Sequence, residues 1–244
     1  MRILLLGGTT EASLMAKTIA DHGIAGVFSY AGRTDSPVMQ PLPQRVGGFG
    51  GVAGLVDYLR SEAITHVIDA THPFAAQMST HAVAACSETG TPLIALERKP
   101  WRPGPGDDWL LVPRMEDAVQ ALPSAPARVF LAIGRLQLEV FTARPEHHYI
   151  LRLVDPPRDL PFAAEVILSR GPFAYEDDLR LMQERKVQVV VSKNAGGIGA
   201  RAKLDAARAL GLRVILVDRP PVPPRHRVET VAEVMSWLHA DLGE

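Results

Sequence analysis

The sequence lacks the features that define several protein classes. It has a single cysteine, so it can form no intramolecular disulfide and no thiolate metal cluster. Its first apolar run ends at glycines within a few residues, which is too short for a membrane span, and no signal-type cleavage site follows it. We therefore expect a protein of the reducing cytoplasm, in which Cys86 is a small buried residue on a helix.

An excess of charge of one sign is also missing. The 26 lysines and arginines nearly cancel the 27 aspartates and glutamates, and the formal net charge is -1. Such a balance gives no overall attraction to nucleic acid, although it allows a local basic pocket. We expect neither a nucleic-acid partner nor a membrane, and the sequence says nothing of the oligomeric state.

Several catalytic motifs are absent as well. The sequence contains no G-x-S-x-G, no H-E-x-x-H and no P-loop lysine, which disfavours serine hydrolysis, zinc proteolysis and P-loop phosphoryl transfer. No tyrosine has a lysine at the Tyr-x-x-x-Lys spacing that a short-chain dehydrogenase would use. His147 and His148 lie in a polar connection without metal-ligand spacing, so we predict no metal.

Short Val, Ile and Leu runs alternate with segments of helical period, a pattern typical of parallel strands covered on both faces by helices. The fold class is therefore α/β. The predicted strands are 3–6, 26–30, 66–69, 93–96, 129–133, 150–154, 166–169, 187–191 and 214–217. The predicted helices are 12–21, 55–62, 75–88, 115–122, 175–185, 200–210 and 231–242.

Three strand-plus-loop units recur in the same order in the two halves of the chain. "RILLLGGTTEA" matches "RVFLAIGRLQL", "HVIDATHPFA" matches "QVVVSKNAGG", and "PLIALERKPW" matches "RVILVDRPPV". Convergence on one α/β pattern is an alternative to duplication. We predict two Rossmann-like halves that face a central cleft: residues 1–105 bind a cofactor and residues 106–244 contribute to the substrate cleft, with a Pro/Gly-rich linker near 99–109.

The loop "GGTTEA" joins the first strand to a helix and favours a phosphate ligand. Gly8 allows close approach of a diphosphate, while Thr9 and Thr10 can cap the helix and offer hydroxyls. Glu11 competes with an anion, so it is expected at ribose hydroxyls or against a neighbouring loop. A glycine turn that only joins strand to helix is the simpler alternative.

The second strand ends in "SYAGRT", where a Rossmann-type site meets the adenosine ribose. Arg33, with Thr34 beside it, suits a 2′-phosphate, whereas an acidic residue would suit a free 2′-hydroxyl. The sequence thus favours NADPH over NADH, unless Arg33 is only a solvated surface residue.

Two further loops carry polar residues after strands. In "DATHPFA", Thr71 and Pro73 enclose His72, which is either a structural histidine, a cofactor contact or a proton donor. In "SKNAGGIGAR", a second glycine-rich loop presents Lys193, Asn194 and Gly196, which suit an anion unless the loop is merely a tight turn. Basic residues at two other strand ends, Arg135 and Arg170, add positive charge to the predicted cleft.

In order, the motifs "GGTTEA", "AGR", "DATHPFA", "ERKPW", "AIGRLQLEVF", "LRLV", "SRGPF", "SKNAGG" and "VILVDRP" resemble the precorrin-6A reductase family of cobalamin biosynthesis. The resemblance runs from Ile3 to about Pro220. It implies an oxidoreductase that uses NADPH to reduce one double bond of the precorrin-6A macrocycle, giving precorrin-6B, without metal or flavin.

This resemblance gives the predicted residues their roles. The macrocycle carries many acetate and propionate groups, which Arg135, Arg170 and Lys193 can bind, and His72 or Lys193 can deliver the proton that balances the hydride. The family also contains cobalt-precorrin-6A reductases of the anaerobic route, and the motifs do not separate the two routes. A protein that binds NADPH or a tetrapyrrole without catalysis is the remaining alternative.

Overall fold

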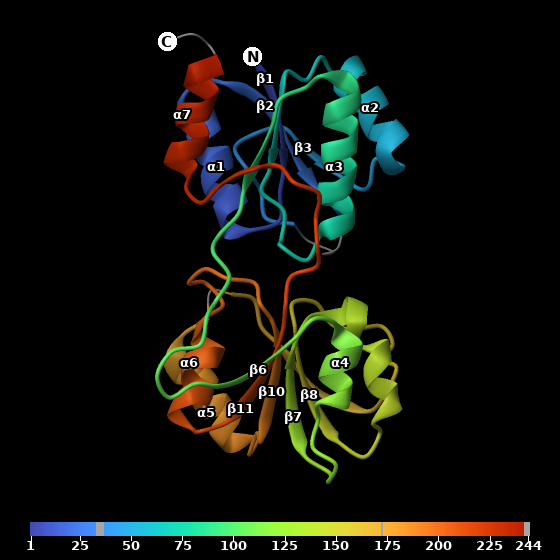
Figure 1. Cartoon of the computed structure of the whole chain (residues 1–244), viewed down its shortest axis with the longest axis vertical. Coiled ribbons are helices and arrows are strands. Elements are labelled where there is room, and N and C mark those ends of the chain that lie inside the picture. Colours follow the sequence, from blue (N-terminus) through green and yellow to red (C-terminus); the bar gives the residue numbers. More distant parts are fainter. Residues whose placement is uncertain (33–36, 172, 242–244) are drawn as a thin grey trace. The chain divides into compact units, whose positions relative to one another are not determined.

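The chain leaves one α/β unit after Lys99, forms a second unit, and returns to the first after Pro220 (Figure 1). The first unit holds residues 1–99 and the segment from 221 on, and the second holds residues 100–220. The computed structural model describes residues 1–32, 37–171 and 173–241. Among these, no helix has the length and apolar character needed to cross a membrane.

The sheet of the first unit has six parallel strands in the order β12-β5-β4-β1-β2-β3. Its strands are β1 (Arg2–Leu6), β2 (Ala25–Tyr30), β3 (Gln44–Val46), β4 (His66–Asp69), β5 (Leu93–Leu96) and β12 (His226–Val228). Its helices are α1 (Thr10–Asp21), α2 (Gly51–Ser61), α3 (Ala76–Thr89) and α7 (Val231–Asp241).

Apolar cores lie on both faces of this sheet. Side chains of α1 and α7 pack with Ile3, Leu5 and Ile68 on one face, and those of α2 and α3 pack with Leu4 and Leu6 on the other. Burial on both faces is the reason that β1 reads as an unbroken apolar run.

The sheet of the second unit also has six parallel strands, in the order β6-β11-β10-β7-β8-β9. Its strands are β6 (Asp108–Val112), β7 (Arg128–Ala132), β8 (His148–Leu153), β9 (Ala164–Leu168), β10 (Val189–Lys193) and β11 (Arg213–Val217). Its helices are α4 (Met115–Gln120), α5 (Tyr175–Glu184) and α6 (Ala202–Ala209), with short 3-10 turns η1 (Arg135–Gln137) and η2 (Glu139–Ala143).

The two sheets place the three repeated segments at equivalent positions. The first repeated segment forms β1 in one sheet and β7 in the other. The second forms β4 and β10, and the third forms β5 and β11. At the edge beyond β5 and β11, one sheet has β12 and the other has β6. The α/β class and the parallel sheets are therefore confirmed, and the sequence repeats mark equivalent strands.

Two parts of the predicted organisation need correction. The segment from Pro221 on was assigned to the second domain, but its strand β12 completes the first sheet by pairing with β5. The predicted linker is also part of the second unit, where Trp101 is buried and Asp107 binds Arg208. The three unpredicted strands, β3, β6 and β12, all lie at sheet edges, where a strand can pair on one side only and leave much of its surface exposed.

Candidate functional site

The loops that follow β1, β4 and β5 converge at the carboxyl end of the first sheet. They meet around a narrow gap that is lined by residues including Thr9, Glu11, Thr71, Pro73 and Arg98. Carboxyl ends of neighbouring parallel strands are the usual ligand-binding edge of an open α/β sheet. Four of the predicted cofactor residues thus come together here.

The two glycines of the first loop have different reasons to be glycine. A Cβ on Gly7 would lie 2.1 Å from Cζ of Phe28, so Gly7 allows the Phe28 ring to pack against the backbone. Gly8 has a φ of +123°, and no atom lies within 4 Å of the position that a Cβ would take. Only Gly8 therefore leaves open space over the backbone, as close approach of a ligand requires.

Thr9 is the N-cap residue of α1. Its Oγ1 accepts a hydrogen bond from Ala12 N–H (3.0 Å) and donates one to the Ala70 carbonyl beside it (2.9 Å). The hydroxyl of Thr9 therefore fixes the loop against the end of β4, and its contact with a phosphate stays a prediction. Among the described residues, the N–H groups of Thr10 and Glu11 have no acceptor, and they begin the helix.

Glu11 forms an ion pair with Arg98, 87 positions further along the chain. Arg98 Nη1 lies 2.7 Å from Glu11 Oε2, and both side chains are mostly buried. Of the two positions predicted for Glu11, this is the neighbouring loop rather than a ribose. The pairing neutralises a carboxylate that would otherwise repel an anion at the start of α1.

Asp69, the last residue of β4, holds the Thr71 loop. Its Oδ1 accepts hydrogen bonds from Thr71 N–H (3.2 Å) and Thr71 Oγ1 (2.7 Å). In the same loop, Phe74 N–H donates to His72 Nδ1 (3.2 Å), so the neutral His72 ring carries its proton on Nε2. This bond fixes both the ring orientation and the tautomer.

Arg225 lies in the segment that returns to the first unit, and it contacts residues at the ends of β4 and β5. Its Nη2 donates to Glu97 Oε2 (2.8 Å), and its Nε lies 3.7 Å from Asp69 Oδ2. Asp69 and Arg225 are almost fully buried, so the ion pair contributes to the position of the Thr71 loop through Asp69. The other two predicted cofactor residues, Arg33 and Thr34, lie outside the described residues.

The buried side chain of Asn194 holds the second glycine-rich loop in place. The Asn194 side chain is buried, accepts a hydrogen bond from Trp101 N–H (2.8 Å) and donates one to the Trp101 carbonyl (3.2 Å). The Trp101 indole N–H donates to Gly197 O (2.7 Å), and Arg219 donates to the Asn194 and Ala195 carbonyls. The Asn194 side chain therefore holds the loop through Trp101, and its contact with the substrate stays a prediction.

The other predicted substrate residues lie around the carboxyl ends of the second sheet. Lys193 ends β10 and is half-buried, while the following Gly196 is buried with a φ of +71°. Arg135 is exposed at the start of η1 after β7, and Arg170 is exposed after β9, with Nη2 3.7 Å from Asp155 Oδ1. The three cations thus lie at or after the ends of β10, β7 and β9, of which β10 and β7 are neighbours in the sheet and β9 is separated from β7 by β8.

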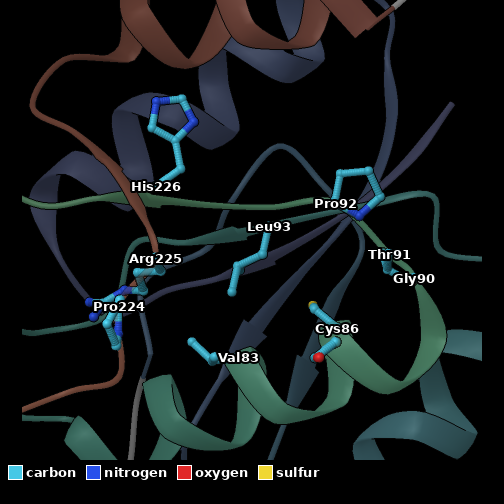
Figure 2. A pocket seen from close by; sticks show the side chains of 10 residues that line it. Val83, Cys86, Gly90, Thr91, Pro92, Leu93, Pro224, Arg225 and His226 are labelled. Atoms are coloured by element: carbon cyan, nitrogen blue, oxygen red, sulfur yellow. The ribbon is translucent and has the colours of Figure 1, made fainter.

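A second, open pocket of the first unit lies away from these loops. It has a volume of about 360 Å³ and is lined by side chains of α3, the α3–β5 turn and the segment before β12. Figure 2 shows Val83 and Cys86 rising from α3 toward Leu93 across this space. Burial raises the pKa of the Cys86 thiol to about 12, so the thiol is not a nucleophile at neutral pH.

Comparison with known proteins identifies the family. The family model described as "Precorrin-6x reductase CbiJ/CobK" matches residues 2–239. The chain belongs to the precorrin-6x reductase family. Its members are oxidoreductases, which agrees with the absence of hydrolase and phosphotransferase motifs in the sequence.

Relatives of this reductase family match along the whole chain. A precorrin-6A reductase from Rhodobacter capsulatus is 62% identical over 244 residues, covering 99% of this chain and 97% of the relative. A precorrin-6A reductase from Rhodococcus erythropolis is 42% identical over 240 residues, covering 97% of each. A solved structure of "CobK precorrin-6A reductase" matches with a TM-score of 0.96 and 61% identity, covering 98% of this chain and 96% of the other.

The structure adds reductase residues that the sequence reasoning did not select. Arg98 and Trp101 lie in "ERKPW", which directly follows a predicted strand, but neither was predicted as a site residue. Their place directly after β5 was a usable signal, since residues that follow parallel strands reach the ligand edge. Arg219 carries the same signal, because it lies two residues after β11 as Arg98 lies two residues after β5. Arg225 had no such signal, because it acts on Asp69 and Glu97, which are distant in the sequence.

Proposed function

We propose that this chain is a precorrin-6A reductase, which uses NADPH to reduce one double bond of the precorrin-6A macrocycle and gives precorrin-6B. The observation that carries the proposal is the 62% identity to a curated precorrin-6A reductase along almost the entire chain. Cobalt-precorrin-6A as the substrate, and binding without catalysis, are the competing possibilities.

The residues at the carboxyl end of the first sheet fit a dinucleotide. Gly8 leaves open space, and the N–H groups of Thr10 and Glu11 can donate to a diphosphate at the positive end of the α1 dipole. The Glu11–Arg98 ion pair removes the repulsion that a lone carboxylate would exert there. Thr71, His72 and Pro73 would form the opposite wall, held in place through Asp69.

When bound, the nicotinamide supplies a hydride to an electron-poor carbon of the macrocycle. This chain's residues have to orient the reactants, exclude water and provide a proton. Arg135, Arg170 and Lys193 would bind carboxylate groups of the substrate, while Asn194 and Trp101 keep the Lys193 loop in one conformation.

Two side chains are proposed as sources of the proton. The Lys193 ammonium carries a proton that it can donate to the reduced macrocycle, directly or through water. His72 already accepts the Phe74 N–H at Nδ1, so its neutral ring can donate a hydrogen bond from Nε2 but has no spare proton to transfer. The geometry therefore favours Lys193 as the donor and His72 as a contact to the cofactor.

The test is anaerobic incubation of the purified protein with precorrin-6A and either NADPH or NADH. Nicotinamide oxidation and the mass of the macrocycle are followed together. A gain of two hydrogens, matched one for one by NADPH oxidation, is the expected result. If only cobalt-loaded substrate is reduced, the chain belongs to the anaerobic route, and if neither is reduced although both ligands bind, the proposal of catalysis fails.

A further inference from the structure

Arg45 on β3 is a rigidly held arginine without a carboxylate partner among the described residues. Its Nη1 donates to Ser29 Oγ (2.8 Å) on the neighbouring strand β2 and to the Gly47 carbonyl (3.0 Å), and its Nη2 donates to the Gly48 carbonyl (3.0 Å). The guanidinium carbon lies 3.8 Å above the centre of the Phe49 ring. The Tyr58 ring lies on the same group, with its centre 5.2 Å from the guanidinium carbon. Three hydrogen bonds and two aromatic rings therefore fix the plane of the guanidinium.

The charge on this guanidinium is partly removed from water. Partial burial lowers the pKa of Arg45 from its usual value, and all of its hydrogen-bond acceptors are neutral. Most other arginines of the first unit have a carboxylate within 4 Å, as Arg2, Arg60, Arg98 and Arg225 do. A half-buried cation that no carboxylate compensates is expected to be compensated by an anionic ligand.

Hydrogen-bonding capacity remains on the same group. A guanidinium has five N–H donors, of which the described contacts use three. The Nε–H and one N–H of Nη2 have no acceptor among the described residues. These two donors lie on adjacent nitrogens of one planar fork, an arrangement that matches two oxygens of a phosphate group.

The position of Arg45 is at the ribose end of a dinucleotide site. Arg45 pairs in register with Ser29 near the end of β2, and Gly47 N–H donates to the Tyr30 carbonyl (2.9 Å). A Cβ on Gly32 would lie 3.7 Å from Gly47 Cα, so the chain that leaves β2 runs beside this loop. The end of β2 is where Rossmann-type folds meet the adenosine ribose.

We infer that Arg45 binds the 2′-phosphate of NADPH and so contributes to the preference for NADPH over NADH. This inference rests on the proposed function, but it requires nothing of Arg33. Ser29, Gly47, Gly48 and Phe49 are positioning groups, since they fix the guanidinium before the phosphate arrives. Because the guanidinium is already held in one orientation, it loses little conformational freedom on binding, and its contribution to affinity increases.

The test measures binding of two nucleotide probes by calorimetry, 2′,5′-ADP and 5′-ADP, which differ only in the 2′-phosphate. Arg45→Met keeps an apolar stem over Phe49 and removes the fork. We expect this substitution to lower the affinity for 2′,5′-ADP by at least about tenfold and the affinity for 5′-ADP by less than about twofold. Arg45→Lys should give an intermediate loss, because it keeps the charge without the fork. Arg60→Met, which removes an exposed arginine of α2, is the matched control and should change neither affinity.

The outcomes separate the inference from the proposed function. If the unchanged protein does not prefer 2′,5′-ADP to 5′-ADP, the proposed use of NADPH fails. If the unchanged protein has the preference and both Arg45 variants keep it, the role of Arg45 is overturned while NADPH use stands. Equal weakening of both probes would show that Arg45 only shapes the Gly47–Gly51 loop. Because both probes are measured on the same folded sample, partial unfolding of a variant cannot produce a selective loss.

Discussion

Arg98 Nη1 lies 2.7 Å from Glu11 Oε2, and this ion pair joins the loop after β5 to the first turn of α1. It places a compensated carboxylate at a helix start that otherwise favours anions. The pairing explains how a glutamate can stand inside a loop that is proposed to bind a diphosphate.

Substituting the two partners of this ion pair should have different effects on NADPH affinity. Arg98→Met leaves Glu11 uncompensated beside the ligand, so NADPH affinity should fall by about tenfold, or about 1.4 kcal/mol. Glu11→Gln leaves the Arg98 charge available, so affinity should be kept or increased. Fluorescence titration of NADPH measures both, and the double variant should return close to the original affinity. A fall of similar size in both single variants would show that the ion pair acts through the fold alone.

Thr9 and Thr10 are neighbours with different expected roles. Thr9→Ala removes the N-cap hydrogen bond to Ala12, so the free energy of unfolding should fall by about 1 kcal/mol, whereas Thr9→Ser should restore it. Thr10→Ala should leave stability unchanged and weaken NADPH binding. Urea unfolding and NADPH titration on the same samples separate the two effects. Loss of stability in the Thr10 variant would contradict this division.

Asp107 gives a prediction on acid stability. Although burial raises its pKa, hydrogen bonds from Arg208 and from Gly104 N–H more than offset this and hold the pKa below its usual range. A carboxylate with a depressed pKa in the folded state stabilises the protein above its unfolded pKa, and this stability is lost as the pH falls through the folded value. Asp107→Asn should therefore cost about 2 kcal/mol at pH 7 and much less at strongly acidic pH.

The adjacent Asp108 provides the control for this measurement. Its ion pair with Arg213 is exposed, so Asp108→Asn should change the free energy of unfolding by less than about 0.5 kcal/mol. Trp101 and Trp109 lie in the second unit and report its urea unfolding by fluorescence. If Asp107→Asn lowers the free energy of unfolding by the same amount at every pH, the shape of the side chain matters and its charge does not.

Kinetics can separate the proposed roles of Lys193 and His72. Lys193→Arg keeps a cation for substrate carboxylates, but arginine does not release its proton, so kcat should fall by at least about 100-fold. His72→Ala should lower NADPH affinity by about tenfold and should have a smaller effect on the single-turnover rate of reduction. If Lys193→Arg keeps its kcat, Lys193 acts only through its charge and the proton comes from another group.

The sequence predicted the interior of this fold because interior strands carry their own signal. The interior strands β1, β4 and β10 contain successive apolar residues (3–6, 67–68 and 189–191) since helices cover both faces of each sheet, and such runs are readable from residue types alone. The edge strands β3, β6 and β12 were missed for the same reason. Their residues are largely exposed or polar. β6 and β12 become strands through hydrogen bonds to the distant strands β11 and β5, while β3 pairs with the preceding strand β2.

By itself, then, the sequence determined the α/β class, the interior strands, the family and the loops that follow the strands. Only the tertiary structure decided which partners those loops have: Glu11 with Arg98, Asn194 with Trp101, and the returning segment with β5. Strand and helix patterns depend on residues a few positions apart, which a sequence displays directly. The three contacts named above join residues about ninety or more positions apart, and their choice depends on the packing of the whole unit, which no local pattern contains.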